Sequence, residues 1–61
     1  MRITEKQIEY LKTLSDNKLW SLGYKMIKAK KWSYHDFGTI CEIWLAIKNG
    51  DEELVQNYIK A

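Results

Sequence analysis

The strongest constraint on this chain is a helix-start signature that occurs twice, at Thr4 with Gln7 and at Ser33 with Asp36. In each pair, a hydroxyl side chain at the N-cap can accept a hydrogen bond from the backbone N–H three residues later. The later side chain can accept one from the backbone N–H of the N-cap in return, which completes a capping box. Because Asp36 is shorter than the usual glutamate or glutamine, we expect its return bond to be the weaker of the two.

Apolar residues flank each pair at the two positions of a hydrophobic staple, Ile3 with Ile8 and Trp32 with Phe37. A staple fixes the direction in which the chain enters a helix. The chain also contains no proline, a residue that would interrupt a helix interior. Together these features predict an all-α protein.

Apolar spacing predicts a compact bundle of three main helices and a short C-terminal helix, over residues 5–14, 18–31, 34–48 and 52–60. The third helix is apolar around most of its circumference, so we expect it to be central. Gly50 should end it, because glycine readily adopts the left-handed conformation that follows many helices, and Asp51 should cap the fourth helix. Gly23, in the middle of the second helix, predicts either a close approach of another helix or a mild kink.

The end of the chain resembles the helix–turn–helix of an ankyrin repeat, through Leu45-Ala46, Asn49-Gly50-Asp51, Glu53, Val55, Ile59 and Ala61. The resemblance covers 17 residues, 45–61, and lacks the Thr-Pro-Leu-His element of that family. It implies an antiparallel pair of helices and no more.

The length of 61 residues predicts one domain, residues 1–61, close to the lower limit for folding without a metal or a disulfide. The single cysteine excludes an intrachain disulfide and a cysteine-based zinc site. Three Trp, four Tyr and one Phe can fill a small core or serve a subunit interface, and we expect a homodimer. No apolar run suits a signal peptide or a membrane span, so we expect a cytoplasmic protein without membrane contact.

Composition favours a particular kind of source. Lysine outnumbers arginine nine to one, and isoleucine, asparagine and tyrosine are common. These residues have A/T-rich codons, which is typical of low-GC bacteria and of their phages and mobile elements. Short genes in such elements often encode regulators or inhibitors of larger proteins, so we favour this class of function.

We expect no catalytic, cofactor or metal site. Cys41 lies on the apolar face of the third helix, where a free cysteine usually acts as a small hydrophobic residue. The only histidine, His35, is six positions earlier and about 120° around the same helix. A thiol nucleophile needs a base within hydrogen-bond reach, so these two residues do not suggest a cysteine enzyme.

The second helix carries more apolar surface than one core requires. One stripe consists of Leu19, Leu22 and Met26, and a second stripe beside it consists of Trp20, Tyr24 and Ile27. Exposed apolar surface on a small protein usually marks a contact site. We therefore predict a protein-binding surface made of Trp20, Tyr24, Ile27, Trp32 and Tyr34, with Lys25, Lys28 and Lys31 steering it toward an acidic partner.

Nucleic acid is the alternative partner, because lysines near aromatic side chains suit a phosphate backbone and stacked bases. The candidate residues are Tyr24, Lys25, Lys28, Lys30, Lys31 and Trp32. However, the net charge is only +2, Arg2 is the single arginine, and base-reading surfaces favour arginine. The acidic start of the fourth helix, residues 51–53, would also repel phosphate. Protein binding is therefore the first prediction and nucleic-acid binding the second.

Overall fold

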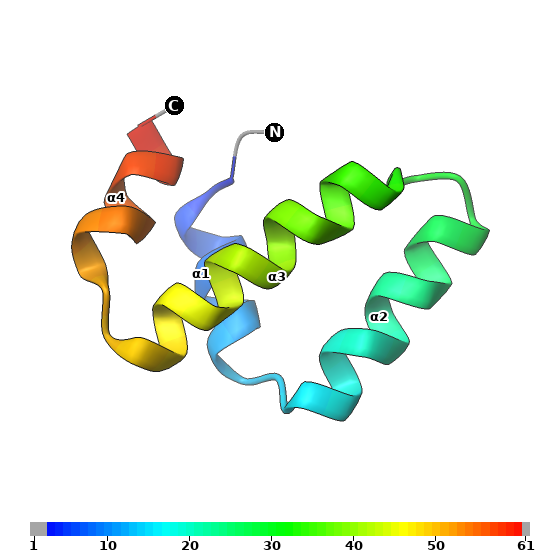
Figure 1. The fold of residues 1–61 in the computed structure, drawn as a ribbon, viewed down its shortest axis with the longest axis horizontal. Helices are drawn as coiled ribbons and strands as arrows, with labels where there is room; N and C mark the ends of the chain where they lie inside the picture. Colours follow the sequence, from blue (N-terminus) through cyan, green and yellow to red (C-terminus); the bar gives the residue numbers. More distant parts are fainter. Residues whose placement is uncertain (1–2, 61) are drawn as a thin grey trace.

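The computed structural model of the chain describes residues 3–60. They form four helices and no strand: α1 (Glu5–Lys12), α2 (Asp16–Lys28), α3 (Tyr34–Asn49) and α4 (Glu52–Lys60). In Figure 1, α3 crosses in front of α1, with α2 along one side and α4 along the other. The predicted all-α bundle is confirmed. No helix within residues 3–60 is long and apolar enough to cross a membrane.

Both predicted capping boxes form. The Thr4 hydroxyl accepts a hydrogen bond from the Gln7 backbone N–H at 3.2 Å, and Gln7 Oε1 accepts one from the Thr4 N–H at 2.9 Å. At α3, the corresponding distances between Ser33 and Asp36 are 3.1 and 3.0 Å, so the return bond to Asp36 is slightly longer than the one to Gln7 but is fully formed. The Ser33 backbone N–H lowers the pKa of the Asp36 carboxyl, because the bond favours the ionised form.

The boundaries of α1 and α2 differ from the prediction. We expected the first helix to reach residue 14, but it ends at Lys12, and the Thr13 hydroxyl donates to the Tyr10 carbonyl at 2.7 Å. We expected the second helix over 18–31, but Ser15 caps it by accepting from the Lys18 N–H, so it begins at Asp16. It ends at Lys28, before Lys30 turns the chain in the left-handed region at φ 61°.

The predicted end of α3 and start of α4 are confirmed. Gly50 has φ 74°, and the Asp51 backbone N–H donates to the Ala46 carbonyl at 2.9 Å. Asp51 Oδ1 then accepts from the Leu54 N–H at 3.2 Å, which caps α4. After this turn α4 packs back onto α3. Ala61, which ends the ankyrin-like segment, lies outside the described residues.

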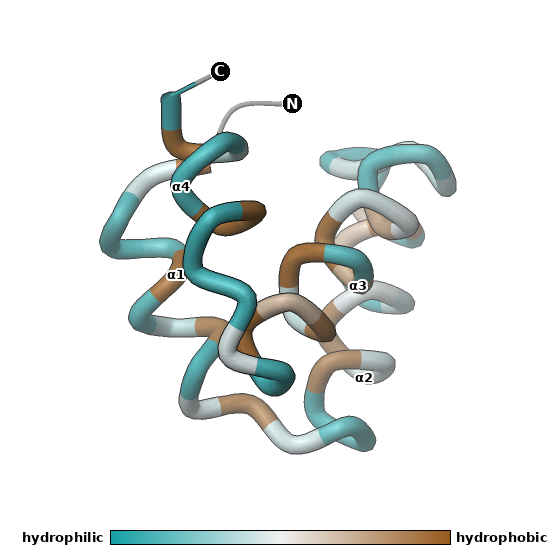
Figure 2. Tube along the Cα trace, turned by 60° about the vertical axis from the view of Figure 1, so that its left-hand side comes forward, coloured by the Kyte–Doolittle hydropathy of each residue, from teal (hydrophilic) through white to brown (hydrophobic). Residues whose placement is uncertain are grey.

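The core surrounds α3, which contacts each of the other three helices, as expected of a central helix. The buried apolar side chains of the core are Ile3, Ile8, Leu11, Leu14, Leu19, Phe37, Ile40, Ile43, Ala46 and Val55. Ile43 has no exposed surface at all. In Figure 2, hydrophobic segments recur along α3, while α4 presents longer hydrophilic stretches.

Gly23 permits a close approach of α2 to α3, the first of the two alternatives that its position suggested. A β-carbon at this position would overlap three carbons of the Phe37 ring. The same ring meets Trp20 edge to face, with centroids 5.1 Å apart, and stacks against Trp32 at 6.4 Å. Phe37 therefore fixes how α2 lies against α3.

Trp44 and Lys48 join α3 to the end of α1. The Trp44 indole N–H donates to the Leu14 carbonyl at 3.1 Å, and Lys48 Nζ donates to the Lys12 carbonyl at 3.2 Å. The Lys48 ammonium also lies 5.3 Å from the centre of the Trp44 ring, a cation–π distance. These bonds satisfy two carbonyls at the α1–α2 connection that the helices leave unpaired.

Candidate interaction surface

Four large apolar side chains on α2 and α3 are more than half exposed. The exposed fractions are 59% for Trp20, 71% for Tyr24, 82% for Tyr34 and 54% for Leu45. Single exposed apolar residues are common on soluble proteins, but a contiguous group of them is informative.

On α3, one side of the helix carries Tyr34, Gly38, Cys41 and Leu45, spaced three or four residues apart. Tyr34, Gly38 and Leu45 are exposed and Cys41 is half-buried. The buried residues Ile40 and Ile43 lie on the opposite side. Figure 1 shows α1 behind α3, so this stripe looks away from α1, between α2 and α4.

A shallow depression of about 120 Å³ joins the α3 stripe to α2. It is lined by Asp16, Leu19, Trp20, Cys41, Trp44 and Leu45. Trp20 and Leu45 therefore belong to one surface, and Tyr24 follows Trp20 one helical turn along α2. We call this the α2–α3 surface and define it by Trp20, Tyr24, Tyr34, Gly38, Cys41 and Leu45.

Trp20 is held in position although most of it is exposed. Its ring meets the buried Phe37 ring at an interplanar angle of 82°. An edge-to-face pair of this kind contributes about 0.5–1.5 kcal/mol beyond the area it buries. The exposed part of Trp20 is therefore ordered before any partner arrives, which lowers the entropy lost on binding.

Two residues predicted for the contact surface lie partly inside the protein. Ile27 and Trp32 are half-buried and pack against the core. Trp32 stacks on Phe37, with an angle of 17° between the two ring planes. Both side chains therefore extend the core, and direct contact with a partner stays a prediction for them.

The predicted lysines are fully available to a partner. Lys25, Lys28 and Lys31 are exposed. The ion pair found within residues 3–60 joins Lys12 to Glu9, so it does not involve these lysines. Their charge can therefore act over the Debye length of about 8 Å at physiological ionic strength.

The two residues considered for catalysis do not form a reactive pair. His35 is exposed at the first turn of α3, and Cys41 is half-buried in the depression. Burial raises the pKa of the Cys41 thiol, and the negative charge of Asp16 raises it further, so less of the reactive thiolate is present at neutral pH. Within residues 3–60, no three His, Cys, Asp or Glu side chains are grouped to hold a metal ion.

Sequence reasoning missed Leu45 and Cys41 as surface residues. Cys41 was assigned to the apolar face of the third helix, and Leu45 was named only in the ankyrin-like segment. In the structure Leu45 is 54% exposed. The available signal was the width of that face, since a helix apolar around most of its circumference must expose some of it. The periodicity alone could not tell which side the other helices leave uncovered.

The chain matches no protein-family model, no curated protein and no solved structure.

Proposed function

We propose that this protein is a non-enzymatic protein-binding module that contacts a larger protein through the α2–α3 surface and regulates or inhibits it. The observation that carries the proposal is the gathering of Trp20, Tyr24, Tyr34 and Leu45, each more than half exposed, on adjoining sides of α2 and α3. Tryptophan and tyrosine are among the residues most enriched in binding hot spots, where truncation to alanine costs about 2 kcal/mol or more.

The chemistry of the surface favours a protein partner with acidic groups. The depression between Trp20 and Leu45 offers an apolar pocket for a partner side chain. Lys25 and Lys28 lie on the same helix as Trp20 and Tyr24, and attraction by such charges chiefly raises the association rate. A homodimer, which the small size of the chain led us to expect, would bury the same surface against a second copy.

Affinity capture from a lysate of the source organism tests the proposal, with nuclease-treated and untreated halves. The bait is the wild-type chain, the Tyr24→Ala/Tyr34→Ala variant or the Tyr10→Ala variant. Tyr10 is a matched control, because it is a 54%-exposed tyrosine on α1, away from the α2–α3 surface. All three proteins should have the same helical circular dichroism, since alanine favours helix and neither Tyr24 nor Tyr34 is buried.

We expect the wild-type and Tyr10→Ala baits to capture one protein at near-equal stoichiometry. The Tyr24→Ala/Tyr34→Ala bait should not capture it, and nuclease treatment should not change its recovery. Equal capture by all three baits would show that the partner binds elsewhere. Partners that disappear after nuclease treatment would instead favour the nucleic-acid alternative. In that case, binding should weaken steeply with salt, and the slope should decrease with each lysine removed.

A further inference from the structure

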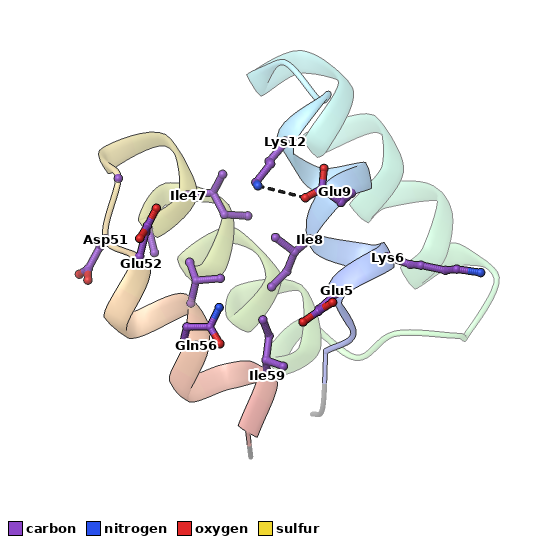
Figure 3. Close-up of a pocket in the computed structure, with 13 residues that line it drawn as sticks. Glu5, Lys6, Ile8, Glu9, Lys12, Ile47, Asp51, Glu52, Gln56 and Ile59 are labelled. Carbon is purple, nitrogen blue, oxygen red and sulfur yellow. Dashed lines mark hydrogen bonds and ion pairs between the residues drawn. The ribbon is translucent and has the colours of Figure 1, made fainter.

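A second concave surface lies between α1 and α4, apart from the α2–α3 surface. It is a groove of about 670 Å³ that α1, the end of α3 and α4 line together (Figure 3). Both α1 and α4 pack on α3, and the groove occupies the space between them. The volume is within the range of about 300–1,000 Å³ typical of ligand-binding pockets.

The floor of the groove is apolar. It includes Ile8 from α1, Ile47 from α3, and Val55 and Ile59 from α4. Ile8 and Val55 are buried, whereas Ile47 and Ile59 are half-buried and keep apolar surface facing solvent. Figure 3 shows Ile8, Ile47 and Ile59 converging on one space from three helices. A partner could therefore bury apolar side chains along this row.

The rim of the groove is acidic. Four carboxylates line it, from Glu5, Glu9, Asp51 and Glu52. Of the two lining lysines, Lys12 is paired with Glu9 at 3.1 Å, and Lys6 points away from the groove in Figure 3.

Glu5 and Glu52 are the rim charges that remain available. Within residues 3–60 neither side chain has a hydrogen bond or an ion pair, whereas Asp51 uses one oxygen to cap α4. Each is the first residue of its helix, where the helix dipole favours a negative charge. The fold brings these two helix starts to the rim of one apolar groove.

We propose that this groove binds an amphipathic helix from a partner protein, with lysine or arginine on both sides of its apolar stripe. A helix laid in a groove places side chains at i, i+3 or i+4, and i+7 on the floor. Its flanking positions then face the two rims, where Glu5 belongs to α1 and Glu52 to α4. Basic flanking residues would pair with these carboxylates, and acidic ones would be repelled. The proposal does not depend on the function assigned to the α2–α3 surface.

Two synthetic helical peptides provide the test. They share one leucine stripe and differ only in their flanking residues, which are all lysine in one and all glutamate in the other. The groove would recognise such a helix through its apolar stripe and its basic flanks, so peptides that carry only these two features are appropriate probes. Binding of each labelled peptide to the full chain is measured by fluorescence anisotropy, at low and at physiological salt.

The matched variants are Glu52→Lys and Glu53→Lys. Both reverse one charge in the first turn of α4, so their effects on helix stability are alike, but only Glu52 lines the groove. We expect the lysine peptide to bind more tightly than the glutamate peptide. At low salt, we expect Glu52→Lys to raise the dissociation constant of the lysine peptide about fivefold, and we expect Glu53→Lys to change it little.

The proposal is wrong if the lysine peptide does not bind, if both peptides bind equally, or if the two variants have the same effect. The other possible occupant is a second copy of the chain, because its own α2 is rich in lysine. Sedimentation of the chain without peptide tests for self-association. If the wild type and Glu53→Lys are dimers and Glu52→Lys is a monomer, the groove binds a second copy and the proposed foreign helix is excluded.

Discussion

The packing of α2 on α3 makes a strong prediction about two glycines. Gly23 and Gly38 both lie inside helices, where replacing glycine with alanine normally stabilises a protein by about 1 kcal/mol. At Gly38 an added β-carbon has no neighbour within 4 Å, so Gly38→Ala should gain this full amount. At Gly23 the same methyl group would overlap the Phe37 ring.

The cost at Gly23 follows from how Phe37 is held. Trp20 meets the ring edge to face and Trp32 stacks on it, so the ring cannot move aside without breaking these contacts. Overpacking of a core costs about 1–3 kcal/mol. We expect a cost in the upper part of this range, because the two tryptophans restrict movement of the Phe37 ring. After the propensity gain is subtracted, Gly23→Ala should be about 1–2 kcal/mol less stable than the wild type.

Urea unfolding followed by far-UV circular dichroism measures both variants against the wild type. Gly38→Ala should raise the free energy of unfolding and Gly23→Ala should lower it, so the two variants should differ by about 2–3 kcal/mol. In a chain of this size, this separates their melting temperatures by roughly 10 °C or more. If Gly23→Ala proved as stable as Gly38→Ala, α2 would not pack on Phe37 as described. The position of Trp20 on the α2–α3 surface would then be wrong as well.

Three further predictions concern the turns and bonds that hold the helices in place. Lys30→Gly should raise the free energy of unfolding by about 1 kcal/mol, because Lys30 has a positive φ that costs a residue with a β-carbon; an unchanged urea midpoint would argue against this turn. Trp44→Phe should lower the free energy of unfolding by about 1–2 kcal/mol, because the Leu14 carbonyl loses its donor, and equal stability would show that the bond is not formed. Asp36→Asn should be less stable than the wild type at neutral pH, because the Ser33 N–H lowers the folded-state pKa of Asp36 and so stabilises the folded protein above the ordinary aspartate pKa. That difference should shrink as the pH falls through the lowered pKa, and urea unfolding across the acid range would contradict the assignment if the difference stayed constant.

Most of the helical structure was predictable because its determinants are local. The capping boxes at Thr4 and Ser33 and the glycine stop at Gly50 each depend on residues a few positions apart. The end of α2 was not predicted, because no glycine marks it. Lys30 adopts the left-handed conformation that is typical of glycine, so the predicted helix extended to residue 31.

The surfaces were only partly predictable, because they depend on how the helices are placed. The excess of apolar residues indicated that Trp20 and Tyr24 would be exposed, and they are. It could not identify Leu45, since that required knowing that α1 covers the opposite side of α3. The groove between α1 and α4 was not predicted at all. Its floor combines Ile8 and Ile59, which are distant in the sequence and meet only in the folded chain.

Alkylation of Cys41 tests most directly whether the α2–α3 surface is the partner interface. Cys41 is the only cysteine of the chain and lines the depression beside Trp20 and Leu45, so its modification reports on this surface alone. The rate of iodoacetamide labelling is measured by mass spectrometry for the free chain and for the complex recovered by affinity capture. The reaction is run at a mildly alkaline pH, because the pKa of the Cys41 thiol is raised. We predict that the bound partner strongly slows labelling of Cys41. Labelling at the same rate in the complex and in the free chain would contradict the proposal and place the interface elsewhere.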